Sequence, residues 1–140
     1  MYPQNNDNFG LHLTLDLSGC NIEKLKDISL IYDLLRRLPE IMRMQSITLP
    51  IVVKWLDKNA TIDGISGIIM IAESHISIHT FPEKHYAFAD VFSCRNFDTT
   101  LCTEEFTKLF RPKKFKKNLI RRGFDFNNWL KVLIFFLTII

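Results

Sequence analysis

Two hydrophobic periods are visible along this chain, one of two residues and one of three to four. Leucine occupies every second position from Leu11 to Leu17 with polar residues between, the pattern of a half-buried β-strand. After a short turn over residues 23–26, apolar residues recur at steps of three and four from Ile28 to Met42 and predict an amphipathic helix. Pro39 is expected to kink or divide that helix, because proline has no backbone N–H.

The rest of the chain favours strands, most of them neighbours in sequence. We expect strands over residues 47–56, 65–72, 75–81, 86–93 and 114–122, and a helix that begins after its cap residue Asp98 and ends at Phe110. Pro50 indicates that its strand lies at an edge or carries a bulge, and residues 82–85 are expected to form a four-residue hairpin loop. This order predicts an α+β fold: a two-layer α/β sandwich in which a mainly antiparallel sheet carries helices on one face.

Length and composition indicate one globular domain over residues 1–140. The chain is 47% hydrophobic and 24% charged, a composition typical of neither disordered nor fibrous proteins. Its three cysteines, Cys20, Cys94 and Cys102, are an odd number and form no C-x-x-C pair. Since no charged and apolar leader stands at the N-terminus, we expect a cytoplasmic protein with free thiols.

The positive charge is concentrated toward the C-terminus. Residues 1–107 contain nine Lys or Arg against fourteen Asp or Glu, whereas residues 108–140 contain nine against one. We interpret the basic residues as a solvated surface that includes a basic edge strand over 114–122, and we expect no nucleic-acid partner. Residues 130–140 are almost wholly apolar but too few to span a bilayer, which needs about 20 apolar residues. This tail is expected to cover the core or an oligomer interface rather than contact a membrane.

Candidate chemistry is concentrated in one polar segment, residues 73–80, between two strongly apolar stretches. Polar groups in such a place need hydrogen-bond partners or a function, although a strand that faces solvent would also account for them. His75, His79, His85 and Cys94 are possible metal ligands, but their spacing fits no standard zinc pattern. We therefore expect no metal site.

The longest specific motif is GISGIIMIAESHISIHTFPE over Gly64–Glu83, followed by ADVFSC over Ala89–Cys94. This segment resembles the core of the prokaryotic-type S-adenosylmethionine decarboxylase proenzymes, a family of self-processing pyruvoyl enzymes of spermidine synthesis. The resemblance is dense over residues 63–98 and looser over residues 10–20. It implies a cytoplasmic carboxy-lyase of polyamine biosynthesis that produces decarboxylated S-adenosylmethionine, the aminopropyl donor.

The resemblance implies that the chain cuts itself between Glu73 and Ser74. The Ser74 hydroxyl would attack the preceding carbonyl and turn the amide into an ester, and β-elimination followed by hydrolysis would leave a pyruvoyl group at residue 74. The products would be a β chain of residues 1–73 and an α chain of residues 74–140. The pyruvoyl ketone would serve as the electron sink for decarboxylation, so no external cofactor is expected.

The same matching implies roles for other residues. His79 falls on the family's processing histidine, a base suited to removing the Ser74 α-proton near neutral pH. Ser66 falls on a serine that supports processing by hydrogen bonding, and Cys94 on the cysteine that returns a proton to the substrate α-carbon. The resemblance also implies a homodimer of cleaved protomers with active sites close to the subunit interface.

The expected hairpin loop provides a geometric check on these roles. If Phe81 lies opposite Tyr86, the same register places Glu73 opposite Cys94. Cross-strand Cβ atoms lie about 4.5 to 5.5 Å apart, so Cys94 would lie beside the bond that is cut. A slip of one residue would turn Cys94 to the other face of the sheet.

The substrate-binding positions match the family only in part. Phe81 matches an aromatic position, usually Trp, that packs on the substrate adenine, and Glu83 matches one that holds ribose hydroxyls or a cationic group. Ala60 stands where family members often carry a second aromatic residue, and the sequence FSCR at 92–95 replaces the more usual FTCG. Stacking of a base on an aromatic ring contributes about 1 to 3 kcal/mol, so one missing ring would weaken binding about tenfold or more. Trp55 is a candidate to compensate.

These departures leave two alternatives open. One is a related pyruvoyl-dependent decarboxylase that acts on arginine or ornithine, with identical self-processing. The other is a non-catalytic regulatory homologue that retains the fold and is never cleaved, an interpretation favoured by the basic, apolar-ended tail. Carbon dioxide release from each substrate and the mass of the purified chain distinguish the three hypotheses.

Overall fold

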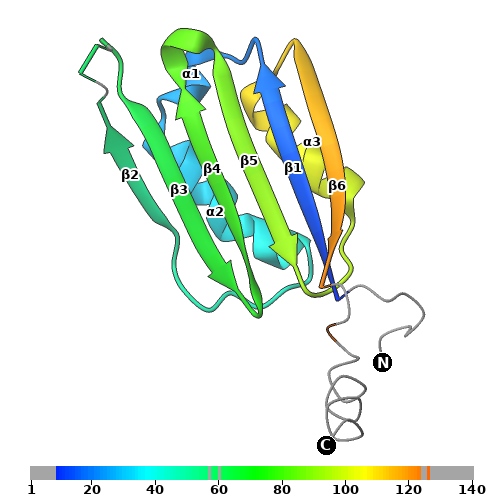
Figure 1. Cartoon of the computed structure of the whole chain (residues 1–140). Helices are drawn as coiled ribbons and strands as arrows, with labels where there is room; N and C mark the ends of the chain where they lie inside the picture. The colour runs from blue at the N-terminus through cyan, green and yellow to red at the C-terminus, as the bar shows by residue number, and fades with distance from the viewer. Residues whose placement is uncertain (1–8, 57, 60, 124–125, 127–140) are drawn as a thin grey trace, which may run out of the picture.

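The computed structural model describes residues 9–56, 58–59, 61–123 and 126, which form one six-stranded sheet with its helices. In chain order the elements are β1 (Gly10–Ser18), α1 (Ile22–Leu25), α2 (Ile28–Ile41), β2 (Ile51–Trp55), β3 (Gly64–Ile71), β4 (Ser74–Phe81), the 3-10 helix η1 (Pro82–Lys84), β5 (Tyr86–Ser93), α3 (Thr99–Phe110) and β6 (Lys114–Arg122). The sheet order is β2-β3-β4-β5-β1-β6, and every neighbouring pair is antiparallel. The first strand of the chain therefore lies between β5 and β6 (Figure 1).

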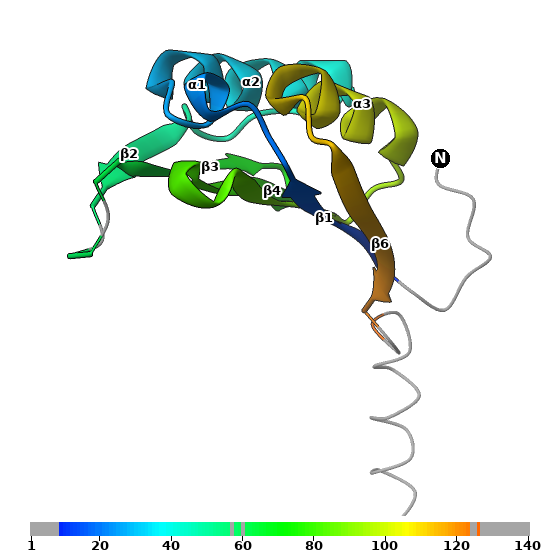
Figure 2. The ribbon, with the colours of Figure 1, turned by 90° about the horizontal axis from the view of Figure 1, so that it is seen from above.

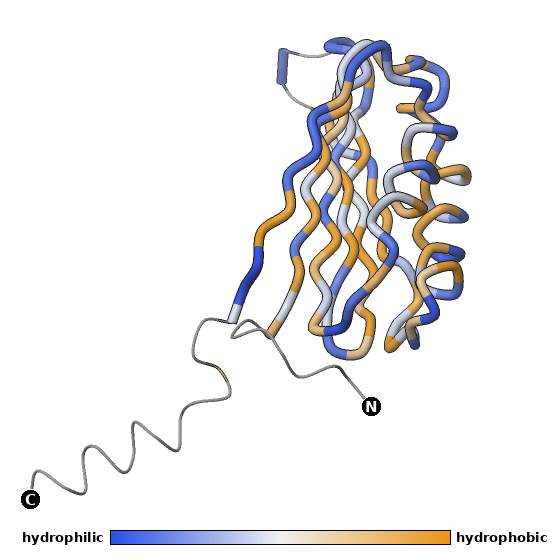
Figure 3. The backbone as a smooth tube through the Cα atoms, turned by 90° about the vertical axis from the view of Figure 1, so that its right-hand side faces the viewer, coloured by the Kyte–Doolittle hydropathy of each residue, from blue (hydrophilic) through white to orange (hydrophobic). Residues whose placement is uncertain are grey.

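The α-helices of the described chain cover one face of this sheet (Figure 2). Apolar and polar residues alternate along the strands (Figure 3), so that one side of each strand packs against the helices. The strand residues buried on that side include Leu13, Leu15 and Leu17 in β1, Ile76 and Ile78 in β4, and Ala87, Ala89 and Val91 in β5. This arrangement confirms the predicted α+β class, the two layers and the antiparallel sheet.

The two longer helices begin where the sequence predicts them. Asp27 caps α2 and Asp98 caps α3, and each carboxylate accepts two backbone N–H groups of the first turn at 2.9 to 3.1 Å. Pro39 was expected to kink or divide this helix; the helix α2 runs without interruption to Ile41, so it is not divided. Pro39 lies in the last turn, where the helix has only two residues left to form.

Most expected strand boundaries agree with the structure to within one residue, but two segments differ further. The expected turn over residues 23–26 overlaps the short helix α1, which is capped by Asn21. The strand β2 begins at Ile51 rather than at residue 47, because Pro50 has no N–H to donate to a ladder. Before Pro50, the chain is hydrogen-bonded to the end of β3 without forming a strand: the N–H of Ile47 donates to the Met70 carbonyl at 2.9 Å, and the N–H of Met70 donates to the Thr48 hydroxyl at 3.2 Å. The predicted edge positions of β2 and β6 are confirmed.

The sheet face away from the helices carries both polar and apolar side chains, and we call it the open face. Register places on it six apolar side chains that are 39 to 59% exposed: Ile51, Val53, Ile68, Met70, Phe88 and Ile120. No described helix covers this face (Figure 2). Exposed apolar side chains that are neighbours, as Ile51 and Ile68 are, mark an interaction site more often than scattered apolar residues do.

The apolar tail, residues 130–140, lies outside the described residues, so its expected role stays a prediction. Within the described part of the chain, no helix combines the length and the apolar character that crossing a bilayer requires.

Candidate active site

Ser74 stands at the start of β4, immediately after the turn from β3. Its hydroxyl donates a hydrogen bond to the carbonyl oxygen of Glu73. The backbone N–H of Cys94, just beyond the end of β5, donates to the Ser74 Oγ at 3.0 Å. The candidate nucleophile is therefore held beside the carbonyl group of its own preceding peptide bond.

Cys94 completes this cluster. Its Sγ lies 3.2 Å from the Glu73 carbonyl oxygen. The register that brings it there is the one expected from the hairpin, with Phe81 opposite Tyr86. Burial raises the pKa of the Cys94 thiol above its ordinary value, a hydrogen bond with Ser74 opposes this change, and the Glu73 charge adds to it. The thiol is consequently protonated at neutral pH and can donate a proton.

Ser66 and His79 form a second pair on neighbouring strands. The register of β3 and β4 places them opposite each other, and Ser66 Oγ lies 2.9 Å from His79 Nδ1. Both side chains are on the open face, and His79 is exposed. The hydrogen bond with the serine thus orients the imidazole on the open face.

The structure does not bring these two pairs together within one chain. Ser74 and His79 are on the same strand, five residues apart. At about 3.3 Å per residue, their backbones are separated by about 16 Å. A base must come within hydrogen-bond distance of the proton it removes. His79 therefore cannot act on the Ser74 of its own chain in this conformation.

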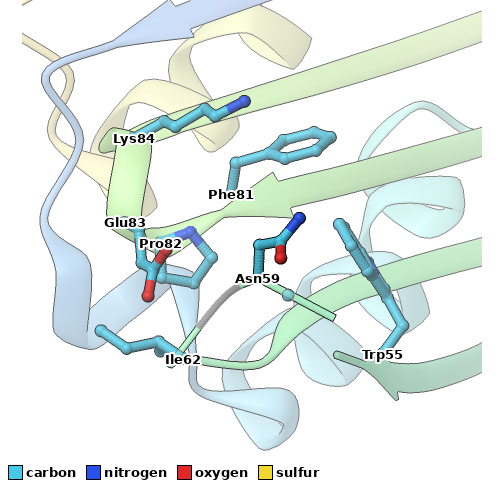
Figure 4. A pocket seen from close by; sticks show the side chains of 8 residues that line it. Trp55, Asn59, Ile62, Phe81, Pro82, Glu83 and Lys84 are labelled. Carbon is cyan, nitrogen blue, oxygen red and sulfur yellow. The ribbon is translucent and has the colours of Figure 1, made fainter. Parts of the chain in front are cut away.

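A pocket of about 250 Å³ lies at the far end of β4 from Ser74. Figure 4 shows Trp55 from β2 and Phe81 from β4 among the side chains that line it, together with Glu83 and Lys84 from the following turn. The two aromatic rings meet edge to face, with centroids 5.5 Å apart. The sequence pointed to Phe81 and Glu83 and offered Trp55 as a candidate to compensate for the missing ring at Ala60, but nothing in it showed that Trp55 reaches this site.

Glu83 holds the connection between β2 and β3 beside this pocket by hydrogen bonds. Its Oε1 accepts hydrogen bonds from the backbone N–H of Thr61 at 2.6 Å and from the Thr61 hydroxyl at 2.5 Å. The hydrogen bond from the Thr61 hydroxyl, followed by those from backbone N–H groups, lowers the pKa of the Glu83 carboxyl. The side chain is therefore an ionised acceptor, suited to hydroxyl donors or a cationic ligand.

Sequence analysis did not single out a further cluster on the open face. His12 Nε2 lies 3.1 Å from Asp90 Oδ1, and the rings of His12 and His75 both lie within 6 Å of the Phe92 ring. Arg122 stacks on Phe92, with its Cζ 4.5 Å from the ring centroid. Burial, and then the charge of His12, lower the pKa of His75. These residues come from four predicted strands, and the only sequence signal was their position on the side of those strands that faces away from the core.

No three His, Cys, Asp or Glu side chains gather closely enough to hold a metal ion in the part of the chain that the structure describes. His75 and His79, which are possible ligands by residue type, instead contact Phe92 and Ser66.

At this end of the α+β sheet, the Ser74 hydroxyl is hydrogen-bonded to the carbonyl of the preceding residue and lies beside a protonated thiol. Comparison with known proteins identifies the family. Residues 11–123 match the S-adenosylmethionine decarboxylase family. The chain therefore belongs to the S-adenosylmethionine decarboxylase family.

Individual relatives agree with this assignment. The chain is 33% identical over 126 residues to the S-adenosylmethionine decarboxylase proenzyme of Clostridium botulinum strain Hall, covering 87% of this chain and 93% of the relative. It is 28% identical over 120 residues to the proenzyme of the same name from Pyrococcus furiosus, covering 85% and 82%. The crystal structure of the adenosylmethionine decarboxylase from Aquifex aeolicus matches with a TM-score of 0.67 at 27% identity, covering 83% of this chain and 92% of that one.

Proposed function

We propose that this chain is a proenzyme that cleaves itself between Glu73 and Ser74, and that the product decarboxylates S-adenosylmethionine for polyamine synthesis. The observation that carries the proposal is the contact of the Ser74 hydroxyl with the Glu73 carbonyl, beside Cys94. Family membership supports the substrate. Neither the described residues nor the comparisons favour a free amino acid as substrate or an uncleaved regulatory homologue.

Cleavage begins when Ser74 Oγ forms a bond to the Glu73 carbonyl carbon and the bond from that carbon to the Ser74 nitrogen breaks. The amide becomes an ester, and the freed nitrogen takes up the hydroxyl proton. Removal of the Ser74 α-proton by a base then expels Glu73 as the carboxylate that ends fragment 1–73. Water replaces the nitrogen at residue 74, ammonia leaves, and fragment 74–140 begins with a pyruvoyl group.

In the mature enzyme the ketone supplies an electron sink of the kind that pyridoxal phosphate supplies elsewhere. Cys94 would protonate the α-carbon of the substrate once carbon dioxide has left, a role supported by its raised thiol pKa. A thiol in that role must stay reduced, and all three cysteines are free. We therefore propose a cytoplasmic location, where thiols are kept reduced.

A homodimer reconciles the separated halves of the site. In an isologous dimer each surface meets the same surface of a second copy, related by a two-fold axis. Two copies stacked by their open faces with opposed β4 strands would place His79 and Ser66 of one copy beside Ser74 of the other. The exposed apolar side chains of the open face support this association, because they would otherwise remain in water.

The dimer also places the pocket where the proposed substrate needs it. A nucleoside held by Phe81 and Glu83 of one copy would extend toward Ser74 and Cys94 of the other. Both copies contribute to each site, so a dimer contains two equivalent sites. Each site would be incomplete in a single chain, because Ser74 and His79 of the same chain are separated by about 16 Å along β4.

The test is the mass of the purified protein together with its turnover. We expect two fragments, 1–73 and 74–140, and a C-terminal fragment lighter by one ammonia than the same fragment with an N-terminal serine. This preparation should release carbon dioxide from S-adenosylmethionine. The variant Ser74→Ala should remain one chain and be inactive. Full turnover by that variant would overturn the proposal.

A further inference from the structure

We infer that Trp55 is a substrate-contacting residue that forms, together with Phe81, an aromatic corner for the base of the nucleoside substrate. The inference rests on the proposed function for the identity of the ligand. It adds a residue outside the segment that carries the family motif, since β2 ends nine residues before Gly64.

Trp55 and Phe81 are on strands that are not neighbours. Trp55 ends the edge strand β2 and pairs with Gly64 of β3, and β4 lies beyond β3. Two strand spacings amount to about 10 Å. At that distance, the side chain of the intervening strand normally keeps the two outer side chains apart. The centroids of the two rings are nevertheless only 5.5 Å apart.

Gly64 is what allows this contact. A Cβ atom at residue 64 would lie 2.7 Å from Trp55 Cε2, which is closer than real Cβ atoms approach other atoms. The indole therefore lies across the bare backbone of β3 and extends toward Phe81. Any larger residue at position 64 would displace it. Trp55, Gly64 and Phe81 thus lie side by side across three strands and together form one wall of the pocket.

The geometry of the corner defines the ligand class. The planes of the Trp55 and Phe81 rings meet at 74°. A flat ring that stacks on one of them presents its edge to the other, and both contacts are favourable aromatic arrangements. The carboxylate of Glu83 lines the same pocket and accepts hydrogen bonds from hydroxyls, as its contact with Thr61 demonstrates. A planar base with a hydroxylated sugar matches this combination.

Lys84 does not prevent a base from entering. Its Nζ lies 5.9 Å from the centroid of the Phe81 ring. A cation–π contact at an exposed site contributes about 0.5 to 1 kcal/mol, whereas a stacked base contributes about 1 to 3 kcal/mol. The base therefore displaces the ammonium group with a net gain, and the flexible lysine side chain can move into solvent.

The indole N–H of Trp55 is buried without a hydrogen-bond partner among the described residues. Packing against Gly64 and Phe81, rather than a hydrogen bond, therefore holds the ring in place. This predicts that phenylalanine can substitute for the tryptophan with a partial loss of contact area, whereas alanine removes the wall.

The experiment compares Trp55→Ala, Trp55→Phe and the control Lys54→Ala, which changes an exposed neighbour on the same strand. For Trp55→Ala we expect KM for S-adenosylmethionine to rise about fivefold to 150-fold, the equivalent of one stacking contact, with self-cleavage and kcat retained. Trp55→Phe should recover most of the affinity, and Lys54→Ala should leave both constants unchanged. An unchanged KM in Trp55→Ala would overturn the inference.

A binding measurement separates this inference from the proposed function. Adenosine should quench tryptophan fluorescence in the wild-type chain and in Lys54→Ala, but not in Trp55→Phe, where Trp129 is the remaining tryptophan. Quenching that persists in Trp55→Phe would contradict the inference even if Trp55→Ala misfolds. Quenching by adenosine without any decarboxylation would refute the proposed function and leave the nucleoside corner standing.

Discussion

Arg122, on the edge strand β6, is a positively charged residue that lowers the pKa of the Cys94 thiol. The pKa of the Cys94 thiol is raised mainly by burial, and the positive charge of Arg122 opposes that increase. As a proton donor the thiol must be protonated, so turnover falls as the pH rises through its pKa. Arg122→Gln removes an opposing charge and should move the alkaline limb of the kcat profile to higher pH, by less than about one unit because salt screens the exposed guanidinium.

Lys116→Gln is the matched control for this prediction. It removes the same charge from the same exposed strand, but Lys116 pairs with Asp16 at the other end of the ladder. We expect its alkaline limb to coincide with that of the wild type. A shift of the Arg122→Gln limb to lower pH, or equal shifts in both variants, would contradict a local effect of Arg122 on the thiol.

Individual site residues differed in how far the sequence could place them. The contact of Cys94 with Glu73 followed from the expected four-residue hairpin loop. One residue pair beside the loop sets the register of the whole ladder, and that register places Glu73 opposite Cys94. Trp55 was not placed in the pocket, because its contact with Phe81 crosses an intervening strand and depends on Gly64. Hydrophobic alternation predicts which face of the sheet a residue occupies. It does not predict that an aromatic side chain will lie over a glycine of the neighbouring strand and contact the strand beyond it.

Among the secondary-structure elements, Thr80 of β4 connects the helical layer to the sheet. Its buried hydroxyl donates to the Leu25 carbonyl of α1 at 2.8 Å and accepts from the N–H of Ile65 in β3 at 2.9 Å. Thr80→Val keeps the volume but leaves both backbone groups without that partner. We expect the free energy of unfolding to fall by about 1 to 3 kcal/mol, as measured by urea denaturation in the uncleaved Ser74→Ala background.

The control for the Thr80 variant is Thr107→Val on α3, in the same background. The Thr107 hydroxyl also donates to a carbonyl, that of Glu104 at 3.1 Å, but it does so at an exposed site where water can replace it. Its effect should stay within about 0.5 kcal/mol. Equal stabilities for the two valine variants would mean that Thr80 does not join the layers.

Elements with local signals were predicted to within a residue. Asp98 marks the start of α3, and the bounds of β5 and β6 match the strands predicted at 86–93 and 114–122. β2 was predicted too long, because apolar residues before Pro50 continue the pattern although the ladder cannot. The insertion of β1 between β5 and β6 depends on pairing between distant segments, which local patterns do not encode.

In the proposed dimer, each active site should be completed by residues from both copies of the chain. Within one chain, Ser74 and Cys94 lie at one end of the sheet, and Ser66 pairs with His79 farther along β4. A mixed dimer of Ser74→Ala and His79→Ala chains would contain one intact site and one site that lacks both groups. If the halves belonged to a single chain, no mixed dimer would contain an intact site.

We therefore expect complementation when the two inactive variants are co-expressed with different tags and the mixed dimer is purified through both. The His79→Ala chain, which keeps Ser74, should be cleaved in the mixed dimer but not in its own homodimer. Carbon dioxide release should reach about half of the wild-type rate per dimer, because one of two sites is intact. Ser74→Ala with Cys94→Ala is the control, since both residues belong to the same half and no site is restored. A mixed dimer of the first pair that forms but neither cleaves nor turns over substrate would refute the shared site.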